Sequence, residues 1–277
     1  LLVLMGSIYR SYRRKFEKSA AYSRELEGEV QARTQELEQQ NNQLADLNEK
    51  LTQASLTDPL TGLRNRRYFY EVIKPLTAGI DRHYTQPERS RDRLLYFMMI
   101  DLDGFKAIND NYGHYAGDMA LAELANLLTA GCRETDTVCR WGGDEFLIVG
   151  EVSDVVEIER VAERLRTGID GNDFKVGDGN LGHMSASIGL CTYPLVPSQP
   201  GLAGWETVSK LADQAAYIAK SSGTNRGVRL AGTPLTDAKT IVEARHRAAD
   251  MVLDKRLALV SSAPVQLEPK EFETAKD

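Results

Sequence analysis

The sequence contains little cysteine, carries no net positive charge and has no long apolar run. Its 277 residues include 3 cysteines, too few and too scattered for a disulfide framework or a Cys-x-x-Cys zinc site. Lys and Arg total 34 against 40 for Asp and Glu, so the net charge is −6 and no overall positive field attracts a nucleic acid polymer. We therefore expect a protein of the reducing cytoplasm that holds any anionic ligand in a local site.

Residues 1–9 are apolar, but a membrane-spanning helix needs ~20 such residues. The residues that follow are strongly basic, as on the cytoplasmic flank of a spanning helix: Arg10, Arg13, Arg14, Lys15 and Lys18, with Glu17 as the one acid. We expect residues 1–15 to be the apolar stub and basic flank of a membrane span, so that a sensor or membrane segment precedes this fragment in a membrane-anchored parent. The start of a soluble helix is the alternative.

Residues 16–55 show a heptad pattern. One core position of the heptads is occupied by Phe16, Ser23, Val30, Leu37, Leu44 and Leu51, and the other by Ser19, Leu26, Arg33, Gln40, Leu47 and Ala54. This spacing predicts a parallel coiled coil and a homodimer, in which Arg33 and Gln40 weaken the seam and leave its register adjustable. A single helix folded back onto the following domain is the alternative.

The rest of the chain alternates helical and strand-like patterns, and its 42% hydrophobic residues suffice for a core. Helices are predicted at residues 66–80, 117–130, 154–169 and 205–221, and strands at 94–101, 137–141, 146–149, 184–191 and 227–230, with a loop over 81–93. We expect an α/β domain at residues 56–231, with helices covering a mixed sheet. Residues 232–277 predict one helix, at 237–260, and then a disordered tail.

Acidic residues stand at two strand ends. The buried strand at residues 94–101 runs into Asp101-Leu102-Asp103, and Gly142-Gly143-Asp144-Glu145 forms a turn between two further strands. Adjacent carboxylates repel one another unless a cation compensates, and glycines let a phosphate approach the backbone. Oxygen ligands of this kind suit Mg²⁺ with a phosphate, although a Gly-Gly-acid turn alone is common.

Three motifs in order, DPLTGLRNRR, DLDGFKAINDNYGHYAGD and RWGGDEF, resemble the GGDEF family of bacterial diguanylate cyclases over residues 56–230. The resemblance implies a mixed sheet similar to the palm of polymerases and nucleotidyl cyclases. It also implies the condensation of two GTP molecules into cyclic di-GMP and two pyrophosphates, with each of two domains presenting one GTP. Together with the apolar stub and basic flank, a bacterial family places the expected parent protein at the cytoplasmic face of the inner membrane.

The resemblance assigns the metal site to the carboxylates of Asp101 and Asp144 and the carbonyl of Leu102, with Mg²⁺ as the metal and Mn²⁺ as an alternative. Asp144 matches the residue that accepts the proton of the attacking 3′-hydroxyl, and Glu145 matches a supporting acid. Whether the proton passes to Asp144, Glu145 or water stays open. Lys106 matches a lysine that faces the phosphates.

Substrate contacts follow from the same match. Asn109 and Asp118 match the pair that reads guanine, because a carboxylate accepts from the N1 and N2 donors that adenine lacks. His114 matches a substrate contact, with a capping or packing role as an equal alternative. Gly142 and Gly143 leave room for phosphate.

The motif YIAKSSGTNRG supplies cations near the end of the domain. Lys220 matches a phosphate-binding lysine, while Thr224 stands where the family often has an arginine. We therefore expect phosphate binding to depend on Lys220 and Arg226, with a raised KM for GTP.

Arg133 and Asp136 have the R-x-x-D spacing of the family's inhibitory product site, with Arg164 as a third contributor. Arginine binds guanine and phosphate, although R-x-x-D alone usually marks a surface salt bridge. Two further hypotheses remain: a catalytically silent receptor for cyclic di-GMP, which the intact acids disfavour, and a cyclase for another dinucleotide, which Asp118 disfavours.

Overall fold

A computed structural model describes residues 13, 15, 28, 30–31, 33–44, 55–86, 92–177 and 179–267. The contacts divide the chain into two units, Leu1–Ser55 and Leu56–Asp277. Among the described residues, no helix combines the length and apolar character needed to cross a membrane. Most of the predicted membrane stub and much of the predicted coiled coil lie outside the described residues.

The described part of the first unit is helical over residues 33–44. Three residues of the predicted seam are exposed in the single chain: Val30, Leu37 and Leu44, at 58%, 56% and 57%. Arg33 pairs with Glu36 on the same helix at 2.8 Å. The exposed apolar residues therefore recur at the seven-residue spacing that the sequence predicts.

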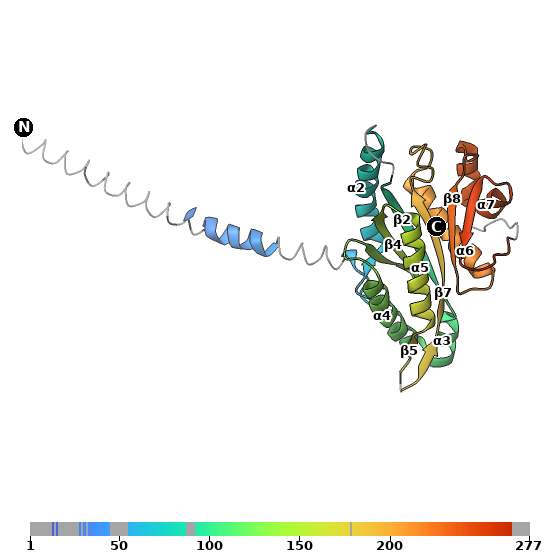
Figure 1. Ribbon diagram of the computed structural model, residues 1–277. Helices are drawn as coiled ribbons and strands as arrows, with labels where there is room; N and C mark the ends of the chain where they lie inside the picture. The colour runs from blue at the N-terminus through green and yellow to red at the C-terminus, as the bar shows by residue number, and fades with distance from the viewer. Residues whose placement is uncertain are drawn as a thin grey trace, which may run out of the picture. The chain divides into compact units, whose positions relative to one another are not determined.

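The second unit is built on a seven-stranded sheet in the order β1-β3-β4-β2-β7-β8-β9 (Figure 1). Its strands are β1 (Arg64–Asn65), β2 (Leu94–Asp103), β3 (Thr137–Gly142), β4 (Glu145–Val152), β7 (Ser185–Tyr193), β8 (Gly227–Gly232) and β9 (Leu257–Ser261). The β1–β3 and β7–β8 pairs are parallel and the other neighbours are antiparallel. A separate hairpin consists of β5 (Asp173–Lys175) and β6 (Leu181–His183).

Helices cover both faces of this sheet (Figure 1). They are α2 (Arg66–Tyr84), α3 (Phe105–Tyr112), α4 (His114–Gly131), α5 (Val155–Asp170), α6 (Trp205–Ser221) and α7 (Ala238–Leu253). One core packs against α2, α6 and α7, and the other against α3, α4 and α5. β2 is buried on both faces: Phe97 and Met99 enter the first core, while Met98 and Ile100 enter the second. This double burial explains its continuous apolar sequence.

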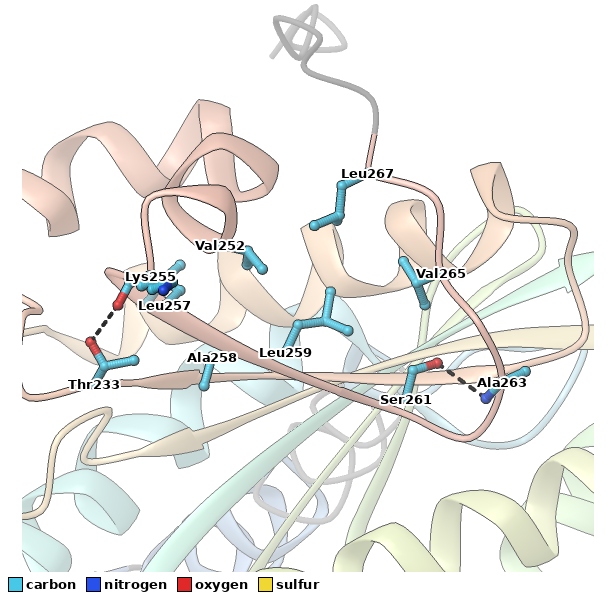
Figure 2. Close-up of a pocket in the computed structure, with 10 residues that line it drawn as sticks. All are labelled: Thr233, Val252, Lys255, Leu257, Ala258, Leu259, Ser261, Ala263, Val265 and Leu267. Atoms are coloured by element: carbon cyan, nitrogen blue, oxygen red, sulfur yellow. Dashed lines mark hydrogen bonds between the residues drawn. The ribbon is translucent and has the colours of Figure 1, made fainter.

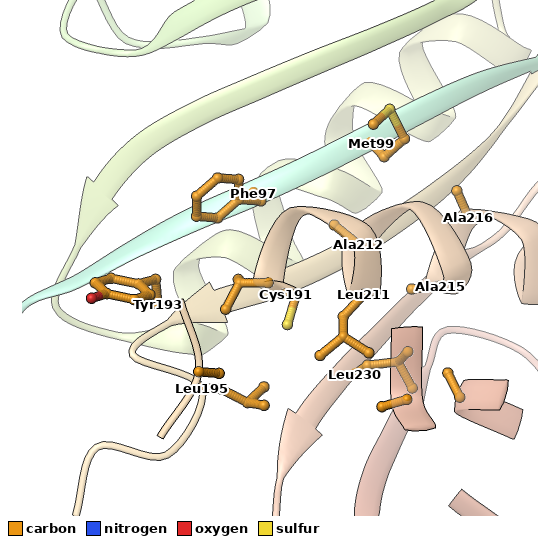
Figure 3. Packing of buried hydrophobic residues seen from close by; sticks show 14 of the residues in the cluster. Phe97, Met99, Cys191, Tyr193, Leu195, Leu211, Ala212, Ala215, Ala216 and Leu230 are labelled. Atoms are coloured by element: carbon orange, nitrogen blue, oxygen red, sulfur yellow. The ribbon is translucent and has the colours of Figure 1, made fainter. Parts of the chain in front are cut away.

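The packing of α6 on β7 fixes the end of α6 relative to the central strands. Figure 3 shows Phe97 of β2 and Cys191 of β7 beside Leu211 and Ala212 of α6. The helix backbone lies directly on Gly189 of β7, where an added Cβ would stand 2.0 Å from the carbonyl oxygen of Ala212. Only glycine permits this close approach.

The predicted α/β architecture is confirmed, with corrections. The sequence patterns did not predict α3, and α2 extends to Tyr84 into the predicted loop. The predicted helix at 237–260 is wrong at its end, because α7 stops at Leu253 and β9 follows. The turn at Lys255, with φ of 60°, redirects the chain so that β9 pairs along β8. Residues 262–267 of the predicted disordered tail have defined contacts, and residues 268–277 lie outside the described part.

Candidate active site

The strand register brings the two acidic motifs together. Asp101 of β2 lies opposite Glu145 of β4 in the antiparallel ladder, and the amide of Leu102 donates to the carbonyl of Asp144 at 3.3 Å. Asp144 itself lies in the turn between β3 and β4. The carboxylates that the sequence predicts as metal ligands therefore lie on β2 and in the adjacent β3–β4 turn, at one end of the sheet.

The glycines of this turn face open space. Gly142 and Gly143 are exposed, and a Cβ added to either would meet no other atom within 4 Å. Gly143 has φ of 53°, a conformation that favours glycine. The space beside the acids can therefore admit a ligand close to the backbone.

A guanidinium connects this turn to the start of the domain. Nε and Nη2 of Arg140 donate to the carbonyl of Gly143 at 3.1 and 2.9 Å, and its Nη1 donates to the carboxylate of Asp58 at 3.1 and 3.2 Å. Asp58 also accepts from the amide and hydroxyl of Thr61. Burial raises the pKa of Asp58, but these hydrogen bonds and the Arg140 charge lower it below its usual value. The sequence motifs contain both residues, yet their pairing was not predicted.

Burial and neighbouring carboxylates together set the electrostatics of this site, with burial the larger cause. Burial raises the pKa values of Asp101, Glu145 and Asp213, and neighbouring carboxylates raise them further. Nζ of Lys220 lies 2.5 Å from Oδ1 of Asp101 and partly offsets the rise in the pKa of Asp101. Burial lowers the pKa of Lys220, but the hydrogen bond to Asp101 and the charge of Asp144 raise it more. The site is a centre of negative charge, with Lys220 beside Asp101 and the charge of Lys210 lowering the pKa of Asp213.

Asp213 was missed by the sequence analysis. It lies on α6 seven residues before Lys220, and therefore on the same face of that helix as the lysine that reaches Asp101. The seven-residue spacing from Lys220 was the sequence feature that could have placed Asp213 at this site.

The donor set fits a hard divalent cation. Asp101 and Asp144 carry carboxylate oxygens and Leu102 carries a backbone carbonyl, which are the kinds of donor that such a cation prefers. Burial and, to a lesser extent, neighbouring carboxylates raise the pKa values of Asp101 and Glu145, and a bound cation would offset both effects. In the part of the chain that the structure describes, no group of three or more His, Cys, Asp or Glu is placed to hold a metal. Mg²⁺ binds proteins through one or two carboxylates together with substrate phosphates, so this sparse set is compatible with it.

Asp103 has a structural role. Its carboxylate accepts hydrogen bonds from the hydroxyls of Ser185 and Ser187 at 2.9 and 2.8 Å, and from the amide of Asn225 at 2.9 Å. It therefore ties the end of β2 to β7 and to the loop after α6.

The predicted base-reading residues lie on two consecutive helices. Asn109 of α3 lies against Gly117 of α4, where an added Cβ would stand 2.1 Å from Oδ1 of Asn109. Asp118 follows Gly117 directly and is exposed, as is His114 one turn earlier on α4. Lys106, in the first turn of α3, is also exposed. The structure thus brings Asn109 next to the segment that carries Asp118.

The predicted product-site residues gather at the start of β3. The amide of Arg133 donates to Oδ2 of Asp136 at 2.9 Å, and Nη2 of Arg164 on α5 donates to the carbonyl of Gly131 at 2.7 Å. The guanidinium of Arg133 pairs with Glu157 of α5, a partner that the spacing did not reveal. Asp136 thus shapes the turn, and Arg133 and Arg164 are exposed beside it.

The loop after α6 gives Arg226 other partners than a phosphate. Its Nε donates to the carbonyl of Thr224 at 3.0 Å, and its Nη1 donates to the carbonyl of Pro264. Lys220, by contrast, reaches the acidic centre. Of the two predicted phosphate-binding cations, only Lys220 contacts the acidic residues.

The fold and the site together define a class of protein: an α/β domain with a mixed sheet and a cluster of carboxylates at the strand ends. Residues 55–226 match the family described as "Diguanylate cyclase, GGDEF domain", and the chain belongs to that family. It is 35% identical over 176 residues to the response regulator PleD of Caulobacter vibrioides, which covers 62% of this chain and 35% of PleD.

Diguanylate cyclase A of Treponema denticola is 32% identical over 180 residues, covering 65% of this chain and 45% of that protein. The chain thus spans less than half the length of PleD and of diguanylate cyclase A. The fold is similar to that of the coiled coil and GGDEF domain of DgcB from Caulobacter crescentus, solved in complex with c-di-GMP, with a TM-score of 0.59 at 24% identity, covering 72% of this chain and 98% of the solved chain.

We predict that Asp58→Asn destabilises the domain in a pH-dependent way. Because the folded-state pKa of Asp58 is below the unfolded value of 3.8, its contribution is present above that value and is lost as the pH falls through the folded pKa. At pH 7 the free energy of unfolding should fall by about 1–3 kcal/mol. Urea unfolding at neutral and acidic pH measures this.

The control is Asp173→Asn, which removes an exposed carboxylate from β5. It should leave the stability nearly unchanged at both pH values. A deficit of Asp58→Asn that is equally large at acidic pH would contradict the assigned role of the charge.

Proposed function

We propose that this domain condenses two GTP molecules into cyclic di-GMP and two pyrophosphates. The observation that carries the proposal is the convergence of Asp101, Asp144 and Lys220 beside two exposed glycines. Membership of the GGDEF family supports the same reaction. The 3′-hydroxyl of each GTP attacks the α-phosphorus of the other, a P–O bond forms and pyrophosphate leaves, and the second such step closes the ring.

Asp101, Asp144 and the Leu102 carbonyl would hold Mg²⁺, or Mn²⁺ in its place, which neutralises the triphosphate and stabilises in-line displacement. Lys106 and Lys220 add positive charge for the phosphates. Asp144 accepts the proton of the attacking hydroxyl in this proposal, with Glu145 and water as the alternatives.

Guanine is selected by Asn109 and Asp118 in this proposal. The contact of Asn109 with the helix turn that carries Asp118 supports a single pocket for the base. The Asp118 carboxylate is exposed and accepts from the N1 and N2 donors of guanine, which adenine lacks. His114, on the same face of α4, completes the contact.

We predict that the protein makes cyclic di-GMP from GTP and Mg²⁺, and that Asp144→Ala reduces the rate by about 100-fold or more. Chromatography of the products measures both. Asp173→Asn, which removes an exposed carboxylate that is not among the predicted site residues, serves as the control and should retain full activity. A folded, dimeric protein that binds cyclic di-GMP but forms none would favour the receptor hypothesis instead.

Each active site holds half of the reactants, so two loaded domains must meet. We propose that residues 16–55 form a parallel coiled coil that makes the homodimer and controls how the domains meet. The exposed positions Val30, Leu37 and Leu44 support this proposal, because an apolar seam of this spacing requires a partner helix. The basic residues that follow residues 1–9 support a parent anchored at the cytoplasmic face of the inner membrane.

We predict that replacing Arg33 and Gln40 together by Leu locks the coiled coil in one register and changes the cyclase rate by about threefold or more. The matched control replaces Gln31 and Glu38 by Leu, which adds the same two side chains outside the seam. Turnover assays with sedimentation analysis measure rate and dimer together. Equal rates in the wild-type and seam-variant dimers would contradict control through register.

We also propose product inhibition at Arg133, Asp136 and Arg164. The gathering of two exposed arginines at one turn supports an anionic ligand there. Glu157 competes for Arg133, so product binding has to displace that ion pair.

We predict that Arg133→Ala raises the inhibition constant for cyclic di-GMP by about 10-fold or more. Glu157→Gln frees Arg133 and should lower the same constant. Initial rates at increasing concentrations of added cyclic di-GMP measure both. Inhibition that neither variant alters would show that the product acts elsewhere.

A further inference from the structure

The loop after α6 is bonded to a segment that lies beyond the family match. The match ends at residue 226, whereas the segment comprises residues 261–267, which begin at the last residue of β9. We call residues 221–227 the phosphate loop, because they follow Lys220 directly, and residues 261–267 the C-terminal segment. The contacts between them involve both ends of the loop.

The first set of contacts is at the start of the phosphate loop. The hydroxyl of Ser222 donates to the carbonyl of Gln266 and accepts from the amide of Gln266, both at 3.1 Å. These bonds use the backbone of Gln266, whose side chain takes no part in them. The residue is exposed, so its side chain can be varied independently of the contact.

The second set is at the end of the loop. The guanidinium of Arg226 donates to the carbonyl of Pro264. The amide of Gly227 donates to the hydroxyl of Ser262 at 3.1 Å, and the hydroxyl of Ser261 donates to the carbonyl of Gly227 at 3.1 Å. The loop is therefore held at both ends by the same stretch of chain.

Apolar contacts anchor the segment itself. Val265 and Leu267 pack against the core, while Pro264 and Gln266 between them are exposed. Figure 2 shows an open apolar pocket with Val265 and Leu267 on one side and Val252 of α7 on the other. Leu259 of β9 lies below them. The alternation leaves the polar backbone groups of residues 264 and 266 facing the phosphate loop.

The phosphate loop needs such support because its backbone is strained. Thr224 and Asn225 have φ of 55° and 46°, in the left-handed region that is unfavourable for residues other than glycine. The amides of Gly223 and Thr224 bond back to the carbonyl of Lys220, each at 3.3 Å. The shape of the loop therefore fixes the last turn of α6, and with it Lys220.

Thr224 also removes a cation from the loop. An arginine at this position would add a guanidinium next to Lys220, and the chain has a neutral side chain there instead. The next cation along the chain, Arg226, is bound by the carbonyls of Thr224 and Pro264. Phosphate binding by this loop then depends on how well Lys220 is placed.

We propose that the C-terminal segment is a positioning element for GTP binding: it holds the phosphate loop, and through it Lys220, in the conformation that receives the triphosphate, with Arg226 as its anchor. The proposal rests on the proposed function, because it names GTP as the ligand of that loop. It assigns a role to residues outside the family match.

The test uses the backbone contact of Gln266. Gln266→Pro removes the amide that donates to Ser222, whereas Gln266→Ala keeps it. We expect Gln266→Pro to raise the KM for GTP by about 3- to 10-fold with kcat changed less than about 2-fold, and Gln266→Ala to match the wild type. Ser222→Ala should raise KM similarly, and Ser222→Thr, which retains a hydroxyl, should restore it.

Calorimetric titration of the full chain with GTP measures the affinity of the loop for GTP independently of turnover. Weaker GTP binding by Gln266→Pro than by Gln266→Ala would uphold the proposal even in a chain that forms no cyclic di-GMP, a result that counts against the proposed function alone. Equal GTP affinity in the two variants, with only a lower melting temperature for Gln266→Pro, would overturn the positioning role. A lower KM in Gln266→Pro would overturn it too, because the segment would then oppose binding.

Discussion

The position of β2 between β4 and β7 is the constraint on which the rest of the site depends. Its pairing with β4 sets Asp101 opposite Glu145, and its pairing with β7 sets Asp103 beside Ser185 and Ser187. Both faces of the strand are buried, so a slip of one residue would exchange the side chains that fill the two cores, disrupt the packing of both, and turn the acids over. The register is thus fixed by hydrophobic burial, and the carboxylates are held in place by that register.

The cluster of partly buried carboxylates lowers the free energy of unfolding. Asp101, Glu145 and Asp213 are partly buried close to one another, and each has a raised pKa. Because the unfolded chain releases these protons more readily, the cluster costs folding free energy at neutral pH. Lys220 offsets part of that cost through Asp101. A bound cation would offset the rest of that cost, and a bound triphosphate would compete with Asp101 for Lys220. Ligand binding would therefore change the stability of the fold through the same charged groups.

The sequence patterns predicted what local periodicity and motif order encode, and missed what tertiary contacts decide. β2 was predicted because a strand buried on both faces has a continuous apolar sequence. The helix at Trp205–Ser221 was predicted because its amphipathic pattern is visible along the chain. The end of the predicted helix at 237–260 was wrong because pairing with β8 makes β9 a strand. The bonds of Arg140 to Asp58 and of Arg133 to Glu157 join residues far apart in the chain, which no spacing rule captures.

The geometry of β3 bears on how a product site would act. Arg133 and Asp136 precede β3, and the glycine turn follows its other end, Thr137–Gly142. A strand of this length separates its ends by roughly 15–20 Å, so a ligand at Arg133 does not reach the acidic centre of its own domain. The proposed inhibition from that turn would therefore have to act on the encounter of two domains rather than on one set of carboxylates. A dimeric coiled coil would control the same encounter, so the two proposed forms of regulation would both act on the meeting of the two half-sites.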